Sequence, residues 1–96
     1  MKRRGKKRAS GRWFVYILEC GDGSLYTGIT NNVEARIGSH RAGKGAKYTR
    51  GRLPLRLVCI ILCRNKGAAL KKEYAIKRLS RNEKLALIRN TTIMDN

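Results

Sequence analysis

Residues 13–30 read WFVYILECGDGSLYTGIT, which is two apolar segments joined by a short polar one. The first segment, residues 13–18, is aromatic and β-branched and predicts a strand that is buried on both faces. Gly21 and Gly23 favour a turn, and residues 25–30 predict a second strand. The stretch therefore predicts an antiparallel hairpin.

The hairpin carries two tyrosines whose relative position depends on its register. In an antiparallel pair, directly opposed residues point to the same face of the sheet. A turn centred on Gly21 places Tyr16 opposite Tyr26. A register shift of two residues keeps both phenols on one face, whereas a shift of one separates them. We expect a shared face.

The remaining elements follow from periodicity and end signals. Residues 32–41 and 68–79 predict helices, and residues 55–63 predict a third strand, which we expect to be the central one. Ser80 and Glu83 have the spacing of a capping box and predict the start of a last helix. The order β-β-α-β-α-α gives an α/β (α+β) class, with a small, mostly antiparallel three-stranded sheet flanked by helices.

The length of 96 residues is enough for one small domain. We place this domain at residues 13–90, after a disordered basic tail at 1–12 and before a frayed tail at 91–96. The longest apolar run, residues 57–63, is too short to cross a bilayer, and no signal peptide is expected. The three cysteines form no CxxC pair, so we expect reduced thiols and a cytoplasmic location.

Charge is the dominant feature of the composition. Lys and Arg total 23 against 6 Asp and Glu, which gives a net charge of +17. Seven of the cations lie in residues 1–12, so subtracting them leaves +10 on residues 13–96. A polyanion is the natural partner of such a domain, and we expect nucleic acid rather than an acidic membrane surface. A general charge excess without a specific partner is the alternative.

Residues 43–52 form a glycine-rich basic segment without an acid. Its spacing is not that of a P-loop, so it does not predict nucleotide binding. It has four cations that can neutralise phosphates without reading bases: Lys44, Lys47, Arg50 and Arg52. The alternative is an exposed loop that contacts only solvent.

The helix at residues 32–41 carries polar side chains on its inward face. We expect Thr30 or Asn31 to cap it and Gly43 to end it. The face with i, i+3, i+4, i+7 spacing comprises Val33, Arg36, Ile37 and His40. Its Arg and its His indicate either a functional site or long side chains that reach solvent from the edge of an apolar stripe.

Glu73 falls on or beside the apolar stripe of the helix at 68–79, between Ala69 and Ile76. Burying an unpaired carboxylate costs several kcal/mol, so a partner is expected. That partner is either a Lys or Arg side chain in an ion pair or a divalent metal ion.

Two tripeptides, Val15-Tyr16-Ile17 and Tyr26-Thr27-Gly28, resemble the paired motif of the GIY-YIG nuclease domain family, which lies on adjacent strands of a hairpin. Arg36 and Glu73 match an arginine and a glutamate on later helices of that family, and His40 matches a histidine that some members carry. The resemblance covers nearly the whole chain beyond the basic tail. It is greatest to small stand-alone bacterial members, akin to the nuclease domain found in the nucleotide-excision repair nuclease.

The resemblance implies a metal-dependent endonuclease that hydrolyses phosphodiester bonds to a 5′-phosphate and a 3′-hydroxyl, with DNA as the expected substrate in repair or processing. It implies a ligand of Mg²⁺ or Mn²⁺ at Glu73 and a phosphate contact at Arg36. A tyrosinate base is the usual proposal in the family, and Tyr16 and Tyr26 both fit it. His40 is expected to receive or relay the proton.

The chain departs from the family pattern at three positions. Val15 replaces Gly, and Thr27 replaces Ile. Members often carry Asn about a dozen residues after the glutamate, where this chain has Leu85; Asn82 and Asn90 are the nearest amides. The alternative function is therefore a nucleic-acid-binding module that keeps the fold without turnover. A protein partner that confers specificity is compatible with either function.

Overall fold

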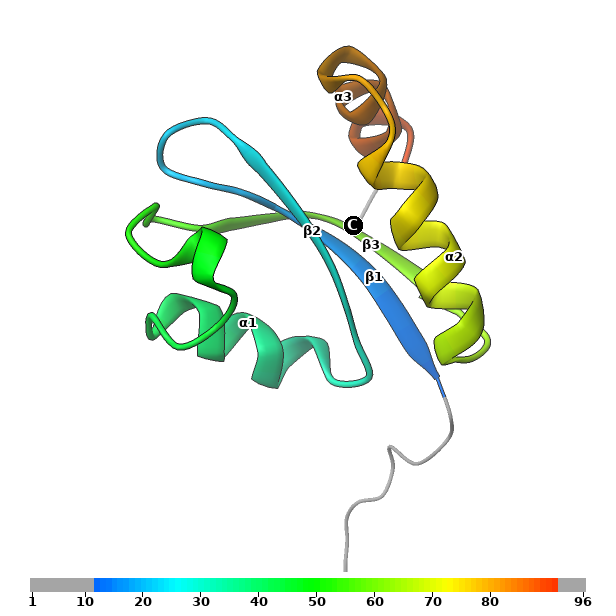
Figure 1. Ribbon diagram of the computed structural model, residues 1–96, viewed down its shortest axis with the longest axis horizontal. Coiled ribbons are helices and arrows are strands. Elements are labelled where there is room, and N and C mark those ends of the chain that lie inside the picture. Colours follow the sequence, from blue (N-terminus) through cyan, green and yellow to red (C-terminus); the bar gives the residue numbers. More distant parts are fainter. Residues whose placement is uncertain (1–11, 92–96) are drawn as a thin grey trace, which may run out of the picture.

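A computed structural model of the chain describes residues 12–91 (Figure 1). Apart from one residue of each, the basic tail predicted at 1–12 and the frayed tail predicted at 91–96 lie outside the described residues. Within 12–91, no helix has the length and apolar character needed to cross a membrane.

The elements occur in the predicted order β-β-α-β-α-α, with one short 3₁₀ helix, η2, inserted before the third strand. Their bounds are β1 Trp13–Glu19, β2 Leu25–Thr30, α1 Val33–Arg41, η2 Lys47–Thr49, β3 Arg56–Cys63, α2 Lys66–Lys77 and α3 Arg81–Asn90. The α/β (α+β) class predicted from the sequence is therefore confirmed.

The sheet has the strand order β2-β1-β3, and β1 pairs antiparallel with both neighbours. The expectation that β3 is central was wrong. A central strand is hydrogen-bonded along both edges, as β1 is, and residues 15–18 of β1 are all buried. At the outer edge of the sheet, β3 leaves Leu62 57% exposed.

The register of the hairpin differs by two residues from a turn centred on Gly21. Tyr16 lies opposite Gly28, and Tyr26 lies opposite Leu18. Because side chains alternate with a period of two, this shift keeps both phenols on one face of the sheet. The expectation of a shared face is confirmed, and the glycine rather than the second tyrosine stands across from Tyr16.

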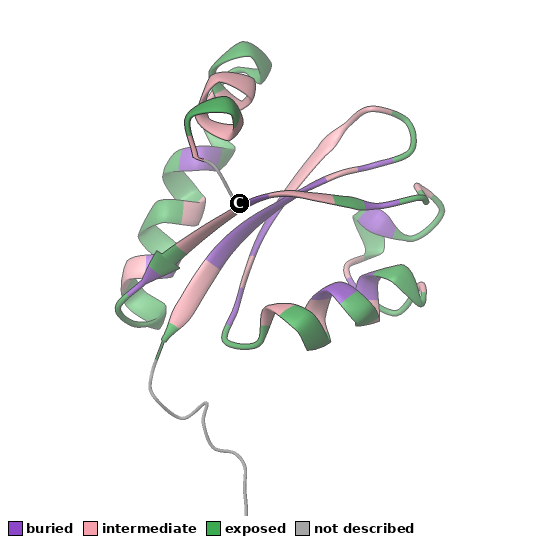
Figure 2. Ribbon diagram, turned by 180° about the vertical axis from the view of Figure 1, so that it is seen from behind, coloured by how far each residue is buried: buried purple, intermediate pink, exposed green. Residues whose placement is uncertain are grey.

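Each face of the sheet has its own core (Figure 2). One face packs against α2 and α3, and its buried members are Val15, Ile17, Cys59, Cys63, Ala69 and Ile76. The other face packs against α1, and its buried members are Tyr16, Leu18, Cys20, Ile37 and Leu55. All three cysteines are free thiols in these cores, as expected. The second core is unusual in having a tyrosine at its centre.

The helices begin where asparagine or serine side chains accept backbone N–H groups. Asn32 caps α1, so the predicted cap at Thr30 or Asn31 was wrong; the Thr30 hydroxyl accepts the Asn32 N–H instead. Asn65 caps α2, which therefore begins two residues earlier than predicted. At the start of α3, Ser80 and Glu83 form the predicted capping box.

We predict that Gly28→Ala destabilises the protein whereas Gly38→Ala does not. A Cβ at position 28 would stand 2.5 Å from the Tyr16 hydroxyl oxygen, whereas one at Gly38, within α1, meets nothing within 4 Å. Urea unfolding should show a loss of about 1–3 kcal/mol for the first variant. For the second it should show a gain of up to about 1 kcal/mol, because alanine favours a helix. Equal effects would contradict the packing of Tyr16 against β2.

Candidate active site

Tyr16, His40 and Thr49 form a chain of buried hydrogen bonds that joins β1, α1 and η2. The Tyr16 hydroxyl lies 2.8 Å from His40 Nε2, and His40 Nδ1 lies 2.8 Å from Thr49 Oγ1. Thr49 Oγ1 in turn donates to the Ala46 carbonyl oxygen at 2.9 Å. Each of the three side chains is at most 1% exposed.

The direction of each hydrogen bond between these three side chains follows from the proton that Thr49 donates and from the neutrality of the His40 ring. A hydroxyl has one proton, and Thr49 gives its proton to a carbonyl that can only accept. Thr49 Oγ1 must therefore accept from His40 Nδ1–H. His40 Nε2 is then the unprotonated nitrogen of a neutral ring, and Tyr16 donates its phenolic proton to it.

Burial sets the protonation states of Tyr16 and His40. Desolvation raises the pKa of Tyr16, although a hydrogen bond with Arg36 opposes that change. Desolvation, followed by the charge of Arg36, lowers the pKa of His40. At neutral pH the two groups are therefore a neutral phenol and a neutral imidazole, with the proton on the phenol side.

Arg36 lies one turn before His40 on α1 and is half-buried. Its hydrogen bond with Tyr16 raises the pKa of the guanidinium, and Tyr26 contributes in the same direction. The spacing that placed Arg36 and His40 on one inward face is thus confirmed. Arg36 keeps a positive charge beside the two phenols.

Tyr26 lies against the same group of side chains from β2. Its ring centroid is 6.3 Å from that of Tyr16 and 5.4 Å from that of His40. On its other side it stacks on Tyr48 of η2 at 5.9 Å. The guanidinium of Arg52 lies 4.1 Å from the Tyr48 ring centroid. Four of the residues predicted for the site, Tyr16, Tyr26, Arg36 and His40, are therefore brought together.

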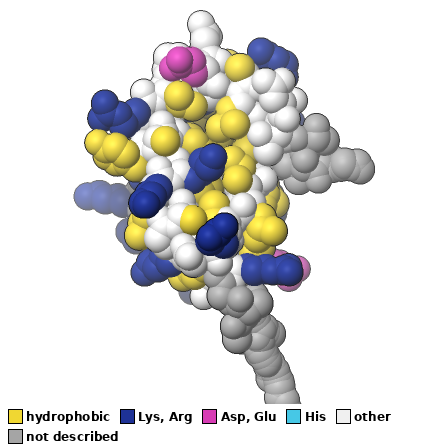
Figure 3. Space-filling model, turned by 90° about the vertical axis from the view of Figure 1, so that its right-hand side faces the viewer, with side chains coloured by type: hydrophobic (Ala, Val, Ile, Leu, Met, Phe, Trp, Pro, Cys, Tyr) yellow, Lys and Arg dark blue, Asp and Glu magenta, His cyan; other side chains and the backbone are white. Residues whose placement is uncertain are grey.

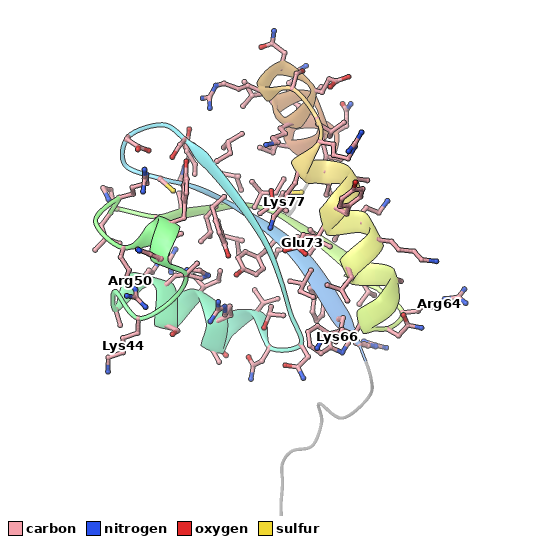
Figure 4. All side chains as sticks on the ribbon, viewed as in Figure 1. Lys44, Arg50, Arg64, Lys66, Glu73 and Lys77 are labelled. Atoms are coloured by element: carbon pink, nitrogen blue, oxygen red, sulfur yellow. The ribbon has the colours of Figure 1, made fainter. Side chains whose placement is uncertain are left out.

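Glu73 comes from α2, on the face of the sheet opposite to α1, and points toward the strands (Figure 4). Its side chain is 19% exposed and its Oε2 lies 3.2 Å from Lys77 Nζ. Among several causes, its negative charge contributes to raising the pKa of Tyr16. Glu73 thus has the cation partner that its burial required, and it interacts electrostatically with the first tyrosine.

The four cations of the 43–52 segment do not share one environment. Lys44, Lys47 and Arg50 are exposed on the α1 side of the molecule, where Figure 4 labels Lys44 and Arg50. Arg52 pairs with Asp22 of the hairpin turn at 3.1 Å and donates to the Tyr48 carbonyl oxygen. The first three therefore face solvent, whereas Arg52 holds the segment against the hairpin.

Three contributors to the site were not predicted from the sequence: Tyr48, Thr49 and Gly45. A Cβ at Gly45 would collide with the His40 ring, so this glycine makes room for the imidazole. Tyr48 and Thr49 lay in a segment interpreted only by its charge. The available signal was the presence of Tyr48 and Thr49 in a glycine-rich basic stretch. Sequence spacing alone does not show that Thr49 contacts His40, nine residues earlier.

Glu73 offers a divalent cation one carboxylate, which pairs with Lys77 in this structure. Within residues 12–91, no group of three or more His, Cys, Asp or Glu side chains is arranged to hold a metal. A single carboxylate is a suitable ligand for Mg²⁺ or Mn²⁺, because Mg²⁺ commonly takes one or two carboxylates and completes its sphere with waters and substrate phosphates. The amides of Asn82 and Asn90 lie on α3, away from α1 in Figure 1.

Comparison with known proteins gives a consistent result. The sequence model of the GIY-YIG catalytic domain matches residues 12–86. A UPF0213 protein of Clostridium perfringens is 55% identical over 82 residues, covering 85% of this chain and 88% of the relative. The solution NMR structure of a UPF0213 protein from Bacillus halodurans is 52% identical with a TM-score of 0.54, covering 81% of this chain and 83% of that one.

A second solution NMR structure, of a protein from E. faecalis, is 31% identical with a TM-score of 0.57. It covers 88% of this chain and 94% of the matched one. The similarity therefore extends over the hairpin, α1 and α2, which are the elements that carry the site.

We predict that acid destabilises the protein through His40. Its pKa is lowered in the folded state, so below about pH 6.5 the unfolded chain binds the additional proton more readily. Stability is therefore complete above that pH and falls as the pH decreases toward the folded-state pKa. Urea unfolding between about pH 7.5 and about pH 5.5 measures this.

The control is His40→Gln, which removes the one histidine of the chain. It should be less stable at neutral pH and should show a flatter dependence on pH in this range. Parallel curves for the two proteins would mean that the imidazole is not held neutral.

Proposed function

The chain belongs to the GIY-YIG catalytic domain family, and on that basis we propose that it is an endonuclease that hydrolyses phosphodiester bonds in nucleic acid with the help of a divalent metal ion. The observation that carries this proposal is the hydrogen bond from the Tyr16 hydroxyl to a neutral His40, next to Arg36. Together these groups offer a proton acceptor and a fixed positive charge, which are two requirements of phosphoryl transfer.

The geometry favours a proton relay in which the Tyr16 phenol is neutral before the reaction begins and passes a proton on to His40. A water molecule at Tyr16 gives a proton to the phenolic oxygen while the phenolic proton passes to His40 Nε2. The water oxygen bonds to phosphorus and the bond to the 3′ oxygen breaks. The departing oxygen takes a proton from solvent, which leaves a 5′-phosphate and a 3′-hydroxyl. His40 then returns its proton to the solvent by way of the Tyr16 hydroxyl.

Arg36 and Glu73 have complementary electrostatic roles in this proposal. The guanidinium of Arg36 stabilises the negative charge that develops on the phosphate oxygens. Glu73 would hold Mg²⁺ or Mn²⁺, which supplies further positive charge at the phosphate when bound. Lys77, which now pairs with Glu73, would then lose its partner.

Charge supports nucleic acid as the substrate, and we favour DNA, in a repair or processing role. Figure 3 faces the α2 side and shows Lys and Arg side chains spread among apolar ones, with few acids. The exposed side chains of Lys44, Lys47 and Arg50 add positive charge on the α1 side. Free cysteines at three buried positions support a cytoplasmic location, where thiols stay reduced. A specificity-conferring protein partner remains a prediction.

A second candidate is a binding module without turnover. The observation that favours it is the ion pair between Glu73 and Lys77, because a carboxylate already paired with lysine is less available to a metal. The amide that family members often carry after the glutamate is also replaced, by the half-buried Leu85. The two functions differ in whether bound nucleic acid is ever cut.

We predict that Tyr16→Phe and Glu73→Gln each lower the rate of cleavage by about 100-fold or more. Branched, nicked and plain duplex DNA, each with Mg²⁺ or Mn²⁺, are the substrates, and strand cleavage is measured at saturating protein. Tyr74→Phe is the control, because Tyr74 is 65% exposed on α2 and contacts Arg78 rather than the site. Equal rates for wild type and Glu73→Gln would remove Glu73 from the mechanism. Tight, salt-sensitive binding by a wild type that never cuts would favour the binding module.

We also predict that Lys47→Ser with Arg50→Ser weakens the salt dependence of DNA binding. Two lost phosphate contacts should reduce the slope of log affinity against log salt by about 1.8, at about 0.9 for each contact. Fluorescence anisotropy at several salt concentrations measures the slope. Arg56→Ser is the control, because Arg56 pairs with Glu19 at 2.6 Å. An unchanged slope in the double variant would show that these two residues do not contact phosphates.

A further inference from the structure

The η2 turn touches the site with two consecutive residues. Tyr48 stacks on Tyr26, and Thr49 accepts a hydrogen bond from His40. Thr49 is fully buried, although it belongs to the connection between α1 and β3, residues 42–55, which is otherwise mostly exposed. A buried hydroxyl in such a loop is costly unless both its donor and its acceptor are used, and here both are.

We propose that Thr49 is a positioning residue that holds His40 in the tautomer protonated at Nδ1, so that Nε2 faces Tyr16 as a proton acceptor. This inference rests on the proposed function for its catalytic meaning, but its structural content is separate. The Ala46 carbonyl accepts the hydroxyl proton of Thr49, which leaves the hydroxyl able only to accept from His40. The tautomer follows from that constraint.

The opposite tautomer would stop the relay. With a proton on Nε2, His40 would donate to the Tyr16 oxygen instead of accepting from it. Arg36, which also bonds to Tyr16, is a donor as well and cannot take the phenolic proton. The phenol would then face two donors and have no acceptor for the proton that it must release when water attacks.

A purely structural role for Thr49 makes a different prediction. If Thr49 only fills space, Thr49→Val should behave like wild type, because valine has the same shape and lacks only the hydroxyl. If the hydroxyl sets the tautomer, Thr49→Ser should rescue the function that Thr49→Val loses. Thr27→Val is a matched control, because the Thr27 hydroxyl is buried on the other face of the sheet without a hydrogen-bond partner.

The experiment uses the single histidine of the chain as its own probe. Nitrogen-15 NMR of the ring distinguishes the two neutral tautomers, and it is measured above the pH at which His40 titrates. Wild type, Thr49→Ser and Thr27→Val should show Nδ1 protonated. Thr49→Val should show a substantial fraction with Nε2 protonated. In cleavage assays Thr49→Val should lose about 10- to 100-fold in kcat with little change in KM, and Thr49→Ser should recover most of it.

The outcomes separate this inference from the proposed function. A wild-type ring protonated at Nε2 overturns the inference even if no variant folds. An unchanged tautomer in folded Thr49→Val also overturns it. A tautomer that switches in Thr49→Val, in a protein whose wild type does not cut, supports the positioning role and rejects the nuclease proposal.

Discussion

The buried hydroxyl of Tyr16 is the constraint to which the rest of the structure conforms. A phenolic O–H taken out of water without a partner costs about 1–3 kcal/mol. His40 supplies that partner at 2.8 Å, so α1 must present its polar residue to the sheet. Gly28, opposite Tyr16, must have no side chain, because a Cβ there would overlap the hydroxyl. The buried Tyr16 hydroxyl is therefore in contact with three features of the fold: the hairpin partner Gly28, the inward face of α1 and its residue His40.

The two faces of the sheet have cores of different chemical character. The buried hydrophobic core under α2 is built from aliphatic side chains and cysteines, and Glu73 of α2 pairs with Lys77 beside it. The face under α1 has polar groups at its centre, and each requires a specific partner at a specific distance. Such a network gives less net stability than apolar packing, but it fixes geometry. A fold this small can accommodate a polar core on one face because the other face is apolar.

The sequence was sufficient for most features that depend on local pattern or on a recognised motif, although it misplaced the N-terminal caps of α1 and α2. It predicted the element order, the shared face of Tyr16 and Tyr26, the inward Arg36 and His40, and a partner for Glu73. It did not predict that β1 is central, because both strands are long apolar runs in the sequence. Only the structure shows that β1 buries residues 15–18, whereas β3 buries Cys59 and Cys63 alone. Thr49 was also missed, since its role depends on how a loop folds back onto α1, and neither periodicity nor spacing encodes that.

The effect of the protein's surface charge depends on salt, whereas the buried hydrogen bonds among Tyr16, His40 and Thr49 do not. The acids Glu19, Asp22 and Glu73 pair with Arg56, Arg52 and Lys77, whereas Lys44, Lys47 and Arg50 add exposed positive charge on the α1 side. Salt screens that charge within about 10 Å at 0.1 M. The bonds among Tyr16, His40 and Thr49 are buried and neutral, so salt hardly affects them. Attraction of a polyanion can therefore vary with ionic strength while the arrangement of the proton acceptor stays fixed.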